Sequence, residues 1–115
     1  VIIDQLQTLN EDGEPQSDFN RGQIVIVNLQ MHLDDNAYID SKRVLAIVRI
    51  DYPDGEMAFL SLNYVTITET EITEINTGFR IPYNADRGTY NVAVMIWDSW
   101  EGYRSYAYQE VTFNV

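Results

Sequence analysis

The sequence predicts an all-β domain, a Greek-key sandwich of seven or eight short antiparallel strands. Turn-forming residues recur at short spacing, and the apolar residues between them alternate with a period near two. No segment has the apolar spacing of an amphipathic helix. A chain of 115 residues suits one domain, residues 1–115, with two layers packed around one core.

The first half of the chain is expected to supply four strands. Residues 1–8 form the first strand, which ends at a polar loop containing the turn dipeptide Asp12-Gly13. Residues 42–51 and 57–65 form a hairpin around the turn sequence YPDGE. Residues 23–33 show the clearest alternation, with one apolar face made by Val25, Val27, Leu29, Met31 and Leu33.

The second half of the chain is expected to complete the sandwich. Residues 66–78 are rich in threonine and glutamate and predict one or two exposed edge strands, where charge discourages pairing with other chains. Residues 79–88 cross over, because Pro82 cannot donate a ladder hydrogen bond. Residues 89–98 and 105–115 close the domain as a final hairpin.

The register of the final hairpin decides where both tryptophans of the chain point. A four-residue loop, residues 99–102, places Asp98 opposite Tyr103 and Tyr90 opposite Val111 without a bulge. The alternation assigns the core-facing positions of the hairpin to Tyr90, Val92, Val94, Ile96, Val111, Phe113 and Val115.

This register turns Tyr106 and Tyr108 outward, beside Met95 and Trp97. The alternative is a five-residue loop, which would turn both tyrosines inward and require a bulge near Gln109. We favour the four-residue loop, because a one-residue slip has to be repaired before the strand ends.

An unusually apolar outer face follows from the favoured register. If residues 42–51 lie beside the hairpin, their outward side chains include Arg43 and Arg49 as well as apolar ones. Soluble monomers rarely expose a large apolar patch, and interfaces are enriched in aromatic residues, methionine and arginine. The alternative is that a segment such as residues 66–78 covers the patch. We expect an interaction face made by Leu45, Ile47, Met95, Trp97, Trp100, Tyr103, Arg104, Tyr106 and Tyr108.

Short motifs in the chain resemble a known class of module. They are Ile81-Pro82, Gly88-Thr89-Tyr90 and Phe113-Asn114-Val115 near the C-terminus, with Phe19 and Gly22 before the second strand. Together they resemble immunoglobulin-like and fibronectin-type-III-like modules of prokaryotic, especially archaeal, surface proteins. The resemblance implies an immunoglobulin-like Greek-key sandwich, an extracellular or pseudo-periplasmic place, and a role in adhesion, spacing or assembly. By analogy, it also implies that the Tyr90 hydroxyl bonds to backbone near the crossover.

The charge of the chain argues against two classes of partner. Eighteen acidic residues against seven basic ones give a net charge of −11, which repels phosphate backbones and anionic lipid headgroups. Nucleic acid and membrane insertion of this segment are therefore not expected, and no apolar run approaches the length of a membrane span. There is no cysteine, so disulfides and thiolate metal sites are excluded.

Few residues suggest catalysis or metal binding. The single histidine, His32, lies on the polar face of its strand with no serine nearby in sequence, so we expect no enzyme. The loop after it carries Asp34, Asp35 and Asp40, whose oxygens suit calcium, although solvated acids are the alternative. No other cofactor is expected.

The sequence therefore predicts a non-catalytic surface module that binds protein. The partner is a second copy or a neighbouring surface-protein domain, in a surface layer, a filament or an envelope-anchored complex such as a motility-filament anchor. The alternative is a carbohydrate-binding module that stacks the tryptophans and tyrosines of the final hairpin on an envelope glycan.

Overall fold

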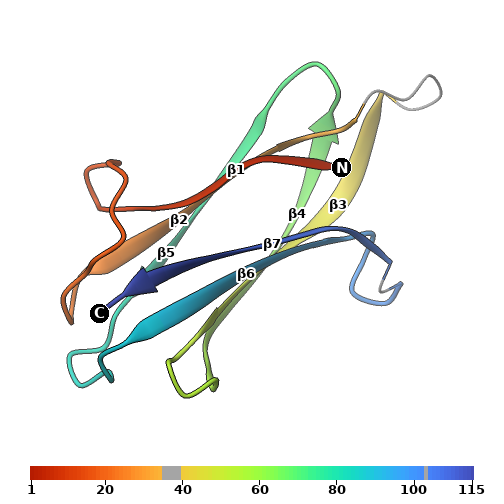
Figure 1. Cartoon of the computed structure of the whole chain (residues 1–115). Coiled ribbons are helices and arrows are strands. Elements are labelled where there is room, and N and C mark those ends of the chain that lie inside the picture. Colours follow the sequence, from red (N-terminus) through yellow and green to blue (C-terminus); the bar gives the residue numbers. More distant parts are fainter. Residues whose placement is uncertain (35–39, 103) are drawn as a thin grey trace.

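Figure 1 shows the computed structural model, which describes residues 1–34, 40–102 and 104–115. The described residues form an all-β fold of seven antiparallel strands, and they contain no helix that is long and apolar enough to cross a membrane. The strands are β1 (Ile2–Leu9), β2 (Ile24–His32), β3 (Ser41–Asp51), β4 (Met57–Thr68), β5 (Thr73–Arg80), β6 (Thr89–Trp97) and β7 (Ser105–Asn114). The predicted strands are confirmed, with ends shifted by a few residues.

The strands form two sheets that pack as a β-sandwich. One sheet has the order β1-β2-β5 and the other has the order β4-β3-β6-β7. The connections from β2 to β3, from β4 to β5 and from β5 to β6 therefore pass from one sheet to the other. The strands run along the long axis, and the two termini lie at opposite ends of the molecule (Figure 1).

The core lies between the two sheets and follows the predicted alternation. Val25, Val27, Leu29 and Met31 of β2 are fully buried, and they face Val44, Ala46, Val48 and Ile50 of β3 and the apolar residues of β6. Tyr90 and Phe113 stack with ring centroids 5.1 Å apart, and Phe19 packs edge-on against Phe113 at 5.6 Å. Burial of these side chains supplies most of the driving force for folding.

The β3–β4 hairpin and its place beside β6 are as predicted. Gly55 closes the turn with φ of 92°, a left-handed conformation that favours glycine. β3 pairs with β4 on one side and with β6 on the other, so Leu45 lies opposite both Tyr64 and Trp97. β5 is an edge strand of the smaller sheet, as the threonines and glutamates of residues 66–78 indicated.

The favoured register of the final hairpin is wrong. The Asp98 N–H donates to the carbonyl of Arg104 at 2.9 Å, so the loop between them holds five residues instead of four. A bulge then changes the register by one residue between Ile96 and Trp97, and Tyr90 pairs with Phe113 instead of Val111.

The bulge lies three residues nearer the loop than the alternative required. Ile96 pairs with Ala107 and Trp97 pairs with Ser105, which leaves Tyr106 as the extra residue. Tyr106 packs against the core cluster, so its predicted outward direction is wrong. Tyr108 lies opposite Met95 and points outward as predicted, because the bulge has restored the alternation before it.

Candidate interaction face

The four-stranded sheet presents a continuous apolar surface on the side that faces away from the core. Its side chains form rows across the strands, because residues paired in adjacent strands share a face. One row contains Tyr108, Met95, Ile47 and Leu62, and the next contains Trp97, Leu45 and Tyr64. We call this surface the outer apolar face and define it as Leu45, Ile47, Leu60, Leu62, Tyr64, Ala93, Met95, Trp97, Trp100 and Tyr108.

Burial differs between the centre and the borders of the outer apolar face. Leu45 and Ile47 are only 1% exposed, although they point away from the core. Their neighbours shield them, while Leu62 and Tyr64 on β4 are 45% and 43% exposed and Tyr108 on β7 is 57% exposed. The sheet thus has a dry centre and apolar borders that remain in contact with water.

The loop between β6 and β7 folds back onto this face. The N–H of Trp100 donates to the Tyr64 hydroxyl at 3.2 Å, and the Trp100 ring lies 5.9 Å from that of Trp97. The loop therefore bridges β6 and β4 above Leu45, which lies between Trp97 and Tyr64. Trp100 itself is 45% exposed, so the bridge adds an aromatic surface instead of hiding one.

A single carboxylate holds that loop in shape. Asp98 Oδ1 accepts the N–H of Ser99 at 2.6 Å and the N–H of Arg104 at 3.0 Å. Ser99 Oγ accepts the N–H of Gly102 at 2.9 Å. These bonds satisfy backbone donors of the turn, and they commit Asp98 to structure instead of ligand binding.

Two of the predicted interaction residues lie away from the outer apolar face. Tyr106 packs against the core, with Lys42 Nζ 4.2 Å from its ring centroid. The Arg104 guanidinium lies 5.5 Å from the centroid of the same ring. Tyr103 lies outside the described residues. Leu45, Ile47, Met95, Trp97, Trp100 and Tyr108 are brought together as expected.

Sequence reasoning missed the contribution of β4. Leu60, Leu62 and Tyr64 alternate along this strand, and all three are at least 40% exposed. The sequence contained a signal for them, which is the alternation along the strand. Because Phe59 and Ile67 occupy core-facing positions, the apolar residues between them at the alternate positions point outward. The predicted hairpin implied that β4 pairs with β3, and its register in the structure places the alternate set on the same face as Trp97.

The outer apolar face contains no charged residue, and the outward positions of the four strands carry no net charge, in a chain whose net charge is −11. The outward positions of β3 hold Arg43, Arg49 and Asp51, and those of β7 hold Glu110, so two arginines balance two acids. Arg49 Nε donates to Asp51 Oδ1 at 2.7 Å, and the Arg43 guanidinium lies over the Tyr64 ring at 4.4 Å.

The outer face of the smaller sheet is polar around Asn28, Gln30 and His32, whereas Ile24 and Ile26 lie on its other half. Asn28 is 1% exposed there, and its side chain bonds to Gln7, Gln30, Glu74 and Asn76 at 2.8 to 3.2 Å. His32 Nδ1 lies 2.7 Å from Asp4 Oδ2 on the same sheet. These amides and carboxylates satisfy one another, which suits a surface in contact with water.

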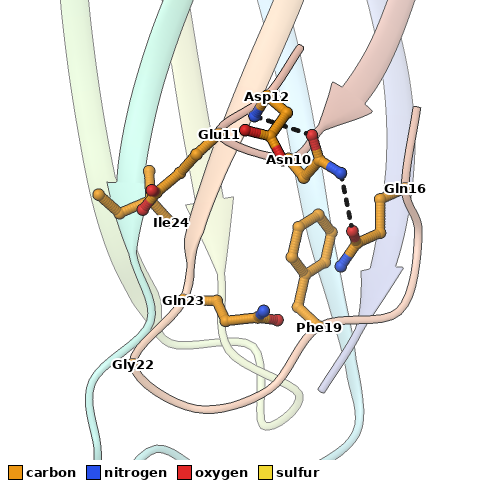
Figure 2. A pocket seen from close by; sticks show the side chains of 8 residues that line it. All are labelled: Asn10, Glu11, Asp12, Gln16, Phe19, Gly22, Gln23 and Ile24. Carbon is orange, nitrogen blue, oxygen red and sulfur yellow. Dashed lines mark hydrogen bonds between the residues drawn. The ribbon is translucent and has the colours of Figure 1, made fainter. Parts of the chain in front are cut away.

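A cavity of about 340 Å³ lies at the β1–β2 connection (Figure 2). Asn10 Oδ1 accepts the N–H groups of Asp12 and Glu14 at 3.0 Å, and Asn10 Nδ2 donates to Gln16 Oε1 at 3.2 Å. Gln23 Oε1 accepts the N–H of Asn20 at 2.7 Å. The side-chain amides that line the cavity are thus hydrogen-bonded to the turns of the connection. Because these groups already have partners, we rank the cavity below the outer apolar face as a candidate site.

The calcium prediction falls on a loop that is only partly described. The described residues contain no cluster of three or more histidine, aspartate or glutamate side chains suited to a metal. Asp34 Oδ1 accepts a hydrogen bond from the Val1 amino group at 2.7 Å, which lowers the pKa of Asp34. Asp40 precedes β3, and Asp35 lies outside the described residues.

Comparisons with known proteins establish the fold alone. No protein-family model and no curated protein matches the sequence. The chain is similar in structure to part of a family 123 glycoside hydrolase from Clostridium perfringens, with a TM-score of 0.57 and 14% identity over 88% of this chain and 23% of the other. It is also similar to the sporulation control protein Spo0M from Bacillus subtilis, with a TM-score of 0.50 and 11% identity over 100% of this chain and 49% of the other. The chain thus spans half or less of either protein.

Proposed function

We propose that the chain is an immunoglobulin-like, fibronectin-type-III-like module that binds a protein partner of the cell envelope through the outer apolar face. Its role is non-catalytic, in adhesion, spacing or assembly outside the cell. The observation that carries the proposal is the row of exposed apolar side chains at both borders of a dry, uncharged face.

The fold features support the module class. The Tyr90 hydroxyl donates to the carbonyl of Asp86 at 2.7 Å, as a tyrosine corner does at the entry to the sixth strand of such modules. The two sheets and their crossing connections fit a Greek-key sandwich. Termini at opposite ends suit a module that spaces or connects other parts of an assembly (Figure 1).

A protein partner fits the face better than a glycan does. Tryptophan, tyrosine and methionine side chains around a dry centre are typical of protein interfaces. Sugar recognition also needs polar groups directed at hydroxyls, and Asp98, the carboxylate nearest to both tryptophans in sequence, is bonded to the backbone of its own loop.

Co-sedimentation with envelope fragments of the producing organism tests the proposal. The domain is expected to bind, and Leu62→Glu to weaken binding about tenfold or more, because a charge would be buried in an apolar contact. Gln5→Glu is the matched control: it adds the same charge to an exposed position on the polar face of the smaller sheet, and binding is expected to be unchanged.

Treating the envelope fragments with protease or with periodate distinguishes a protein partner from a glycan partner. Protease digestion of the fragments is expected to abolish binding, and periodate oxidation of their sugars is expected to leave it intact. Equal binding by Leu62→Glu and the wild-type domain would contradict the proposed face. Loss of binding after periodate alone would support the carbohydrate alternative instead.

A further inference from the structure

Strand β4 is the least protected edge of the sandwich. It is the first strand in the order of the four-stranded sheet, so it pairs with β3 on one side, and no described strand lies on the other. From Phe59 to Thr68 it pairs with β3 residue by residue without irregularity. An exposed row of backbone N–H and C=O groups on such a strand is a template for another strand.

The residue content of β4 differs from that of the other three edge strands. Its 12 residues, MAFLSLNYVTIT, contain no charge, no proline and no glycine. β5 carries Glu74, Gly78 and Arg80, β7 carries Glu110, and β1 carries Asp4 within a bulge. Charges and bulges are the features with which proteins discourage edge pairing, and β4 beyond its first residues has neither.

We propose that β4 pairs antiparallel with β4 of a second copy about a two-fold axis, so that two four-stranded sheets join into one. Such an axis places the middle of the strand, near Leu62 and Asn63, opposite itself. The backbone groups then complete a ladder, and Leu60, Leu62 and Tyr64 of both copies lie side by side on one surface.

Electrostatics permits a second copy at this edge, because β4 itself carries no charge. Two chains of net charge −11 repel each other, and the repulsion is smallest where the contact itself carries no charge. β4 is uncharged, and the outer apolar face beside it has no net charge. A basic partner would instead be attracted to an edge with acidic residues.

The pairing of two copies through β4 does not depend on the proposed envelope contact. It would, however, enlarge the surface that is available for that contact. The outer apolar faces of two joined sheets become continuous across β4, and both Trp100 loops lie on the same side. An envelope partner would then meet two copies of the face at once, which strengthens binding through effective concentration.

Asn63→Lys tests the pairing without changing the outer apolar face. Asn63 is exposed and lies opposite Ala46, on the core-facing side of β4, beyond the cover of the smaller sheet. A lysine there is one of the features by which natural edge strands avoid pairing. Gln109→Lys on β7 is the matched control, since it is exposed, lies opposite Val94 on the same side of the sheet, and makes the same charge change.

The measurement is sedimentation equilibrium from low micromolar to near-millimolar concentration. The wild-type chain and Gln109→Lys are expected to reach the mass of two 13.3 kDa chains, while Asn63→Lys stays at the mass of one. Hydrogen exchange of wild-type β4 amides is expected to slow by tenfold or more as dimer forms, with β5 amides unchanged, and this readout does not require a variant to fold.

Two results would overturn the proposal. One is a wild-type chain that remains monomeric throughout the range. The other is a dimer that Asn63→Lys leaves intact, especially if Tyr108→Glu dissociates it, because Tyr108 lies on the outer apolar face away from β4, and the face and not the edge would then join the copies. Envelope binding by monomeric Asn63→Lys tests the proposed function separately, so failure of one does not imply failure of the other.

Discussion

Tyr90 connects the core to the crossover before β6 through its hydroxyl group. Its ring is fully buried against Phe113 and Tyr52, and its hydroxyl donates to the carbonyl of Asp86 at 2.7 Å. Tyr90→Phe keeps the ring and removes this bond, so we expect the free energy of unfolding to fall by about 1–2 kcal/mol. Urea denaturation followed by circular dichroism measures the change.

Tyr83→Phe is the control for Tyr90, because Tyr83 is 76% exposed and water can solvate its hydroxyl in either state. Unchanged stability in Tyr90→Phe would contradict the role given to the bond. Burial raises the pKa of Tyr90, so the unfolded chain loses this proton first as the pH rises past about 10. The contribution of Tyr90 to stability is therefore complete below that pH and declines above it, and the decline should be shallower in Tyr90→Phe.

Among the elements, the β6–β7 hairpin determines how the outer apolar face is displayed. Asp98→Ala removes the acceptor of two loop N–H groups, those of Ser99 and Arg104. We expect a loss of about 1–2 kcal/mol in stability and a red shift in tryptophan emission, because the loop no longer holds Trp100 beside Trp97 and Tyr64. Both are read from one fluorescence-monitored urea titration.

Glu101→Ala is the matched control for Asp98→Ala, since it removes an exposed carboxylate from the same loop. If both variants shift the emission equally, net charge and not loop geometry would explain the effect. If neither does, Trp100 is held in place by contacts other than the Asp98 turn.

The strands could be predicted from the sequence, whereas the hairpin register could not. Alternation is local, so β2, β3 and β6 show their core faces within a few residues, as Val25 and Val92 illustrate. A five-residue loop followed by one bulge gives Tyr108 the same outward direction as a four-residue loop without a bulge. The choice between them depends on the Asp98 bonds and on Tyr106 packing, which involve contacts that spacing does not encode.

The candidate site was predicted only in part. Leu45, Met95 and Trp97 follow from strand parity and from the expected neighbourhood of β3 and β6. Leu62 and Tyr64 could have been added from the predicted hairpin of residues 42–51 and 57–65, and the register of that hairpin in the structure places them in the same rows as Ile47 and Leu45. The edge strands also differ in charge, and this difference can be recognised only once the strand order shows which strands lie at an edge.

At the scale of the whole molecule, the outer face of the larger sheet is more apolar than that of the smaller sheet around Asn28. The smaller sheet shows water a network of amides and carboxylates around Asn28, while the larger sheet shows apolar side chains around Ile47. The acidic charge of the chain lies outside the outer apolar face, which contains no charged residue. The apolar face of the larger sheet is the surface that we propose binds a protein.

Hydroxyl-radical footprinting of the free and envelope-bound domain tests this account most directly. In the free domain we expect oxidation of Trp100, Tyr108 and Leu62 on the outer apolar face, and of Tyr83, which lies outside that face at 76% exposure. On binding, the first three should be protected several-fold while Tyr83 stays reactive. Equal oxidation of the first three in both states, with protection at Tyr83 or on the polar face, would contradict the account.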